Sequence, residues 1–105
     1  MPATNQTGYQ QLTVGGTAVS LTLPTGVHAR PTHALIQVRG APVRWLATPA
    51  AAPTANTGFL VPAGDFINWL DDDQDNDYYG MLMNVQFVLD ASAIGPATLE
   101  VGYFS

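Results

Sequence analysis

Hydrophobic and polar residues alternate with a period of two along most of the chain, a pattern that indicates strands with one buried face. The alternation is clearest in Met81–Leu89 and in Ala97–Phe104. In both segments every second side chain is apolar, so we expect one face of each strand to line a core. The residues expected to point inward are Met81, Met83, Val85, Phe87, Leu89, Leu99, Val101 and Tyr103.

Glycine and proline separate the remaining strand-like segments, and several of these breaks are short enough for tight turns. Gly15-Gly16 predicts a two-residue hairpin turn, and the first four strands are expected to form a meander. The next two segments predict a third hairpin. No segment shows helical periodicity, so we expect no helix longer than one turn. The six strands predicted in this part are Tyr9–Val14, Thr17–Leu23, Ala34–Arg39, Val43–Ala47, Gly58–Pro62 and Asp65–Leu70.

Eight short strands separated by turns predict an all-β fold, a single antiparallel β-sandwich of jelly-roll-like type. One domain is expected over residues 1–105, with 1–8 as a possible N-terminal arm. The stretch Thr48–Gly58 contains two prolines and many small residues, which favours an extended loop over a helix. The sequence therefore predicts one sandwich that carries a long surface loop.

The composition indicates a protein that meets other proteins. Charged residues make up 10% of the 105 residues and hydrophobic residues 47%, whereas an average domain has roughly 25% charged residues. Neutral polar groups must then cover much of the outside, and some apolar surface is expected to contact other copies or a partner. This balance favours a homo-oligomer over a free monomer.

The charges present argue against two classes of partner. The net charge is −5, from eight acids and three arginines, and lysine is absent. Three arginines are too few to bind a phosphate backbone, and an acidic chain is repelled by an anionic membrane. We therefore expect neither a nucleic-acid nor a membrane partner. The opening M-P-A-T-N-Q-T-G lacks the basic and apolar regions of a secretory signal, which predicts assembly in the cytoplasm.

An acidic run, W-L-D-D-D-Q-D-N-D-Y-Y-G, covers Trp69–Gly80. Its alternating aspartates are oxygen ligands of the kind that calcium prefers. An EF-hand loop is excluded, because that motif needs glycine and glutamate where this chain has Asn76 and Leu82. A solvated loop and a contact with arginines of another subunit are the alternatives to a cation site. The aspartates that could bind a cation are Asp71, Asp73, Asp75 and Asp77.

Arginines and aromatic residues supply the candidate interface. All three arginines lie between positions 30 and 44, whereas the acidic run lies at 71–77, so copies could pair head to tail. The tryptophans and tyrosines could stack on a sugar ring, or they could pack in the core or an interface. The candidate interface residues are Arg30, Arg39, Arg44, Trp45, Trp69, Tyr78 and Tyr79.

Known catalytic and metal-binding patterns are absent from the sequence. His28 and His33 have no cluster of further ligands around them in the sequence, which favours ordinary loop or strand-edge histidines. There is no cysteine, no G-x-S-x-G, no H-E-x-x-H and no glycine-rich phosphate loop. We therefore expect a protein that is not an enzyme and needs no cofactor, with calcium as the one cation to consider.

Three segments resemble small virion proteins of tailed bacteriophages. These are A-L-I-Q-V-R-G-A-P-V-R-W (Ala34–Trp45), T-G-F-L-V-P-A-G-D-F-I (Thr57–Ile67) and A-T-L-E-V-G-Y-F (Ala97–Phe104). The resemblance implies a β-sandwich structural subunit that is present in many copies on the particle. The loop after Trp45 and the acidic run depart from that pattern.

These observations lead to an expected function as a virion structural protein, most simply a capsid decoration or cement protein that stabilises the head. Its expected partners are the major capsid protein or other virion proteins and copies of itself, with a trimer favoured. A neck, turret or tail component is the alternative within this class. A surface module that binds host glycans through Trp69, Tyr78 and Tyr79, with calcium on the aspartates, is the alternative from another class.

Overall fold

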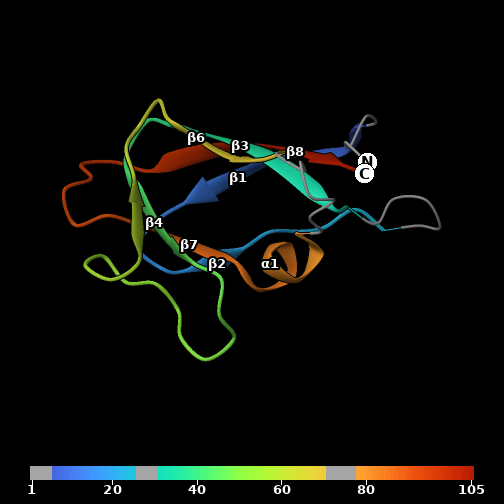
Figure 1. Cartoon of the computed structure of the whole chain (residues 1–105). Coiled ribbons are helices and arrows are strands. Elements are labelled where there is room, and N and C mark those ends of the chain that lie inside the picture. Colours follow the sequence, from blue (N-terminus) through green and yellow to red (C-terminus); the bar gives the residue numbers. More distant parts are fainter. Residues whose placement is uncertain (1–5, 26–30, 71–77) are drawn as a thin grey trace.

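The computed structural model describes residues 6–25, 31–70 and 78–105, which form two four-stranded antiparallel sheets packed face to face (Figure 1). The all-β fold is thereby confirmed. The first sheet has the order β1 (Gln6–Val14), β8 (Ala97–Phe104), β3 (His33–Arg39) and β6 (Phe66–Trp69). The second has the order β2 (Val19–Ser20), β7 (Gln86–Leu89), β4 (Val43–Leu46) and β5 (Phe59–Val61), and a short helix, α1 (Tyr79–Asn84), precedes β7.

The strands pair in a nested order. β1 pairs with β8, β2 with β7, β3 with β6 and β4 with β5. The first strand thus pairs with the last, the second with the second-last, and so on inward. Contacts of β3 with β8 and of β4 with β7 complete the two sheets. Eight strands wound in this way make a jelly roll, as the sequence predicts. Strand β1 begins at Gln6, inside the range 1–8 expected as an arm.

The predicted hairpins and meander are wrong. In every case the two strands of the expected hairpin lie in opposite sheets, as β1 and β2, β3 and β4, and β5 and β6 do. A short turn is compatible with either arrangement, because it can fold a chain back beside itself or carry it across to the facing sheet. The choice depends on which strands can bury their apolar faces together, and here those strands are far apart in sequence.

The strand predicted over Met81–Leu89 is half wrong, because its first part belongs to α1 and only Gln86–Leu89 is strand. In the helix Leu82 is buried and Met83 is 57% exposed, so Met83 does not point inward as predicted. Leucine and methionine are good helix formers, and the three consecutive apolar residues at 81–83 do not distinguish a strand from a helix. With six residues α1 is longer than the single turn expected as a maximum.

The core lies between the sheets and follows the alternation of β8. Leu99, Val101 and Tyr103 point inward and are buried, as predicted, while Glu100 lies on the outer face. The Tyr103 hydroxyl donates to Oε1 of Gln10 at 2.8 Å, and burial raises the pKa of this tyrosine. No helix in the described ranges is long and apolar enough to cross a membrane.

The loop from Thr48 to Gly58 is anchored to the sandwich. The amide of Ala91 donates to the carbonyl of Ala55 at 2.9 Å, and Gly58 ends the loop with a φ of +123°. A Cβ at Gly58 would lie 3.0 Å from the carbonyl oxygen of Trp45. The end of this loop therefore needs a residue without a side chain.

Replacing Gly58 with alanine should lower the free energy of unfolding by about 1–2 kcal/mol, because the backbone conformation and the contact with Trp45 both oppose a side chain. Denaturant unfolding of the purified chain measures the change. Gly95→Ala is the matched control, since a Cβ there meets nothing within 4 Å. Equal stability of the two variants would contradict the expectation.

Candidate functional site

Three predicted interface residues, Trp45, Trp69 and Tyr78, lie in one aromatic cluster that joins the two sheets. Trp69 of β6 contacts Trp45 of β4 edge to face, with ring centroids 5.3 Å apart. Tyr78, which precedes α1, stacks on Trp69 at 6.2 Å. On the other side of Trp45 lies Phe59 of β5, at 5.0 Å. The cluster thus bridges β6, β4 and β5.

Burial differs sharply within this aromatic cluster. Trp69 is 8% exposed, whereas Phe59 is 63% exposed. The interpretation of Trp69 as a packing residue is therefore confirmed, and its ring leaves almost no surface for stacking on a sugar. Phe59 is the member that a partner can reach, and the sequence did not single it out. Its apolar neighbours in β5 are the only available signal, and such neighbours are also typical of buried strands.

His33 extends the cluster on the far side of Tyr78, with the two rings 5.5 Å apart. Its Nδ1 lies 2.7 Å from the hydroxyl of Thr32. His33 is buried, and its Nε2 has no hydrogen-bond partner among the described residues. His33 is the first residue of β3 and so lies at the end of a strand, as predicted. His28 lies outside the described residues.

Arg44 is engaged within its own chain. Its Nε donates to Oδ1 of Asp90 at 2.6 Å, and its Nη1 donates to the carbonyl of Gly58 at 2.8 Å. The Arg44 side chain is 23% exposed and that of Asp90 9%. The ion pair ties β4 to the turn after β7, and the hydrogen bond to Gly58 ties β4 to the start of β5. Arg44 therefore has a structural role within its own chain, and its place at an interface stays a prediction.

Asp90 is a structural residue that the sequence did not single out. Its Oδ2 accepts hydrogen bonds from the hydroxyl of Ser92 at 2.6 Å and from the Ser92 amide at 2.9 Å. These bonds and the Arg44 guanidinium lower the pKa of Asp90 from 3.8 to about 2. An aspartate two residues before a serine is a common turn pattern, which is the signal that could have found it.

Arg39 belongs to a hydrogen-bonded network on the outer face of the first sheet. Its Nη1 lies 2.8 Å from Oε2 of Glu100, and its side chain is 60% exposed. Glu100 also accepts from Nε2 of Gln11, at 3.2 and 3.1 Å, and from the Tyr9 hydroxyl. The Tyr9 hydrogen bond is the main cause that lowers the pKa of Glu100, and the same bond raises the pKa of Tyr9. The network fixes four side chains that span β1, β8 and β3.

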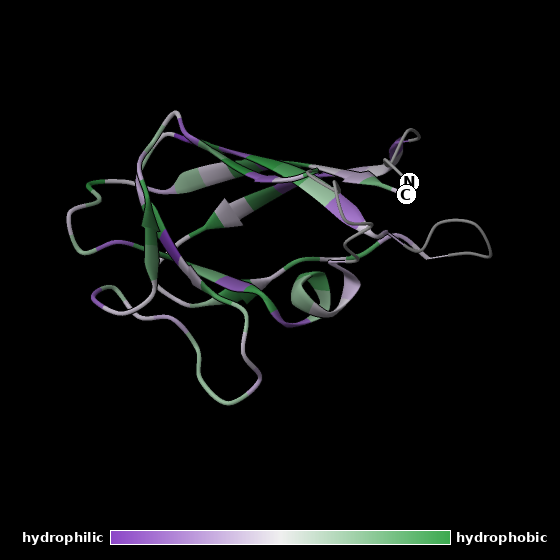
Figure 2. Cartoon of the chain, in the orientation of Figure 1, coloured by the Kyte–Doolittle hydropathy of each residue, from purple (hydrophilic) through white to green (hydrophobic). Residues whose placement is uncertain are grey.

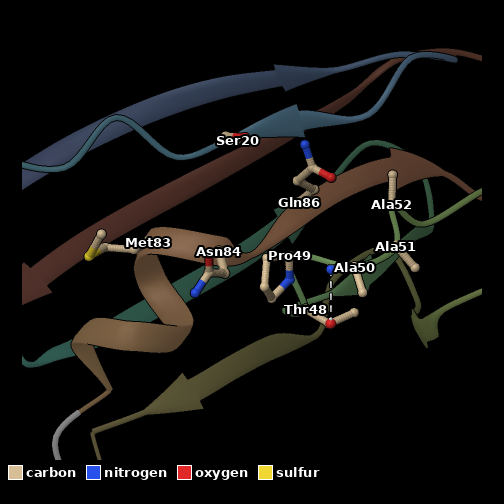
Figure 3. A pocket seen from close by; sticks show the side chains of 9 residues that line it. All are labelled: Ser20, Thr48, Pro49, Ala50, Ala51, Ala52, Met83, Asn84 and Gln86. Carbon is tan, nitrogen blue, oxygen red and sulfur yellow. Dashed lines mark hydrogen bonds between the residues drawn. The ribbon is translucent and has the colours of Figure 1, made fainter.

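Besides a hollow of about 410 Å³ beside Gln11, Thr13, Arg39 and Glu100, two further shallow hollows lie on the outer surface of the described residues. One, of about 240 Å³, lies over Gly102 beside Tyr9 and Phe66. The other, of about 320 Å³, lies between the end of α1 and the loop 48–52, and Figure 3 shows Met83, Asn84 and Thr48 around it. No charged residue lines this second hollow. Both are open, and neither brings together an acid and a base suited to proton transfer.

Of the remaining predicted site residues, Tyr79 is the one that lies within the described part of the chain. The aspartates of 71–77 and Arg30 lie outside the described residues, and Tyr79 opens α1 half-buried. Within residues 6–25, 31–70 and 78–105 there is no group of three His, Cys, Asp or Glu that could hold a metal ion. The calcium site over Asp71–Asp77 therefore stays a prediction.

Comparisons of the chain with protein-family models, curated proteins and solved structures found no match.

Proposed function

We propose that the protein is a virion structural subunit of a tailed bacteriophage, a capsid decoration or cement protein that assembles with copies of itself and with the capsid. The observation that carries this proposal is that the surface of the described residues is poor in free charge and rich in apolar groups. Of the five charged side chains in the described residues, four form the pairs Arg39–Glu100 and Arg44–Asp90. The large exposed hydrophobic residues are Tyr9, Phe59, Leu60, Phe66, Met83 and Ile94.

Such a surface is costly for a solitary domain in water and suits one that is covered in an assembly. Figure 2 shows β5 hydrophobic along its length, and two of its three residues, Phe59 and Leu60, are at least half exposed. Phe66 lies on β6, the other strand at this side of the sandwich. The β5–β6 side therefore offers apolar contact area to a capsid protein.

The jelly roll supports the proposal only by analogy, because viral capsid domains and lectins both use it. Stabilisation of the head follows from mass action. A subunit that binds the assembled shell and not its separated components shifts the equilibrium toward the shell. The chain needs no chemistry of its own for this, only a stable fold and matching surfaces.

Particles that lack the protein should lose their genome at a lower temperature than complete particles, since they lack the binding energy of the subunit. Heating both kinds of particle and following DNA release measures the shift. Adding back the purified chain should restore the higher temperature, whereas a Phe59→Asp and Phe66→Asp double variant should restore less. Unchanged release from particles without the protein would contradict a role as cement.

A neck, turret or tail component is the alternative within the structural class. Copy number separates the two, because a dozen or so copies per particle favours the neck or tail and hundreds favour decoration. Quantitative mass spectrometry of purified particles, scaled to the major capsid protein, gives that number.

A further inference from the structure

Strand β1 forms an unusually long edge of the first sheet, with no further strand beside it among the described residues. It is nine residues long and pairs on one side with β8. The other three edge strands, β6, β2 and β5, have four, two and three residues. Short edge strands are a common protection against pairing with other chains, because they offer few unpaired backbone groups. β1 lacks that protection.

A bulge lies near the start of β1, but the strand lacks other usual protections. It contains no proline and no charged residue, and the first charged side chain of the whole chain is Arg30. On the side away from β8, no other described residue forms a backbone hydrogen bond with Gln6–Val14. The neighbouring segment contacts β1 through Thr22, whose amide donates to the Gln10 side chain, and through Pro24 beside Gly8. Gln10 and Gly8 both lie near Tyr103 on the core side, so among the described residues these contacts leave the backbone edge uncovered.

We propose that β1 pairs antiparallel with β1 of a second copy across a two-fold axis, which joins two four-stranded sheets into one of eight strands. The proposal rests on the self-association that the proposed function includes, and it names the surface. A second copy is the fitting occupant, because an antiparallel edge is complementary to itself and needs no charge to match. Two uncharged edges can also approach without the repulsion expected between chains of net charge −5.

The structure sets the register of this pairing. A bulge between Gln6 and Gly8 interrupts the ladder, so the regular part of the edge runs from Gly8 to Val14. The middle residue of that stretch is Gln11. In an antiparallel sheet, residues directly opposite each other point to the same face. The two-fold axis must therefore lie midway between one residue and the same residue of the second copy. Full overlap of Gly8–Val14 then places Gln11 opposite Gln11 of the second copy.

The side chains suit this register. Tyr9 comes opposite Thr13 of the second copy on the outer face, an aromatic residue against a β-branched one, which is a favourable cross-strand pair. On the inner face Gln10 comes opposite Leu12. Gln11 is already held by Glu100 through its Nε2, so its oxygen is positioned before the second copy arrives. Little side-chain freedom is lost on pairing.

A single introduced cysteine tests the proposal, since the chain contains none. In Gln11→Cys the two thiols would face each other across the two-fold axis. Their Cα atoms would be about 4.5–5.5 Å apart, which suits a disulfide. In Thr13→Cys, on the same strand and face, four residues separate the thiols along the ladder, or about 14 Å. We expect the Gln11→Cys chain to form a linked dimer under mild oxidation at least tenfold faster than the Thr13→Cys chain.

Light scattering of the unmodified chain gives its oligomeric state in a parallel experiment. A dimer of twice 11.1 kDa, or a larger oligomer with an even number of copies, agrees with the proposal. A chain that stays monomeric at all concentrations overturns the β1 pairing. An oligomer in which both variants cross-link equally also overturns it, but still shows that the chain self-associates. A trimer with no linked dimer from Gln11→Cys also overturns the β1 pairing without contradicting the proposed function.

Hydrogen exchange provides an independent readout. Amides of β1 that point away from β8 should exchange at least tenfold more slowly at high than at low protein concentration, while amides of β8, in the middle of the sheet, should not change. Concentration-independent exchange along all of β1 would count against pairing even where light scattering shows an oligomer.

Discussion

Replacing Trp69 with alanine should lower the free energy of unfolding by about 3–5 kcal/mol, the usual cost of removing a buried tryptophan. The indole is 8% exposed and fills the space between Trp45 and Tyr78. Its removal leaves a cavity between the sheets that these two neighbours cannot fill without losing their own contacts. Denaturant unfolding followed by circular dichroism measures the loss.

Phe59→Ala is the matched control from the same cluster. Phe59 contacts Trp45 at 5.0 Å but is 63% exposed, so its removal should cost less than about 1 kcal/mol in the isolated chain. In assembled particles the order of effects should change, because Phe59 is then expected to contact a partner. If both alanine variants unfold at the same denaturant concentration, Trp69 is not the packing residue described here.

Replacing Arg44 with alanine should lower the melting temperature by on the order of 10–15 °C. The change leaves Asp90 without its cation and the carbonyl of Gly58 without its donor. Arg39→Ala is the control, since Arg39 forms its ion pair with 60% of its side chain exposed. Exposed pairs contribute little, so this variant should shift the melting temperature by less than about 4 °C. Equal shifts would contradict the structural role of Arg44.

The same ion pair should give the protein a specific sensitivity to acid. The pKa of Asp90 is about 2 in the folded chain, below its ordinary value of 3.8. The carboxylate therefore stabilises the fold above about pH 3.8, and this contribution is lost as the pH falls from 3.8 through about 2. Melting temperatures measured over that range should fall more steeply for the unmodified chain than for Asp90→Asn. Parallel curves would show that Asp90 does not titrate in this way.

The eight-strand pattern could be predicted because alternation over several residues has few other interpretations. Ala97–Phe104 shows this best, since all three of its predicted inward residues are buried. Met81–Leu89 shows where the signal fails. Because Met81, Leu82 and Met83 are all apolar, this stretch does not distinguish a strand from a helix, and in the structure it forms α1 with Leu82 buried.

Of the candidate site, the sequence identified the residue types and not their partners. The sequence predicts Trp45, Trp69 and Tyr78 as interface residues, and their rings are in contact. Their burial depends on β4 and β6 facing each other across the sandwich. For Arg44 the sequence predicts an interface position but not its bond to Asp90, 46 positions away. Contacts over such separations depend on the strand order, which no local pattern encodes.

The sequence by itself determined the fold class, the number of strands and the scarcity of charge, because alternation and composition are properties of local chain segments. Only the tertiary structure decided which strands pair. Turns of two to four residues allow a hairpin or a crossing between sheets with similar ease. Burial of apolar faces from distant segments selects the nested pairing of β1 with β8 through β4 with β5. That same pairing leaves β1 at an edge, uncharged and nine residues long.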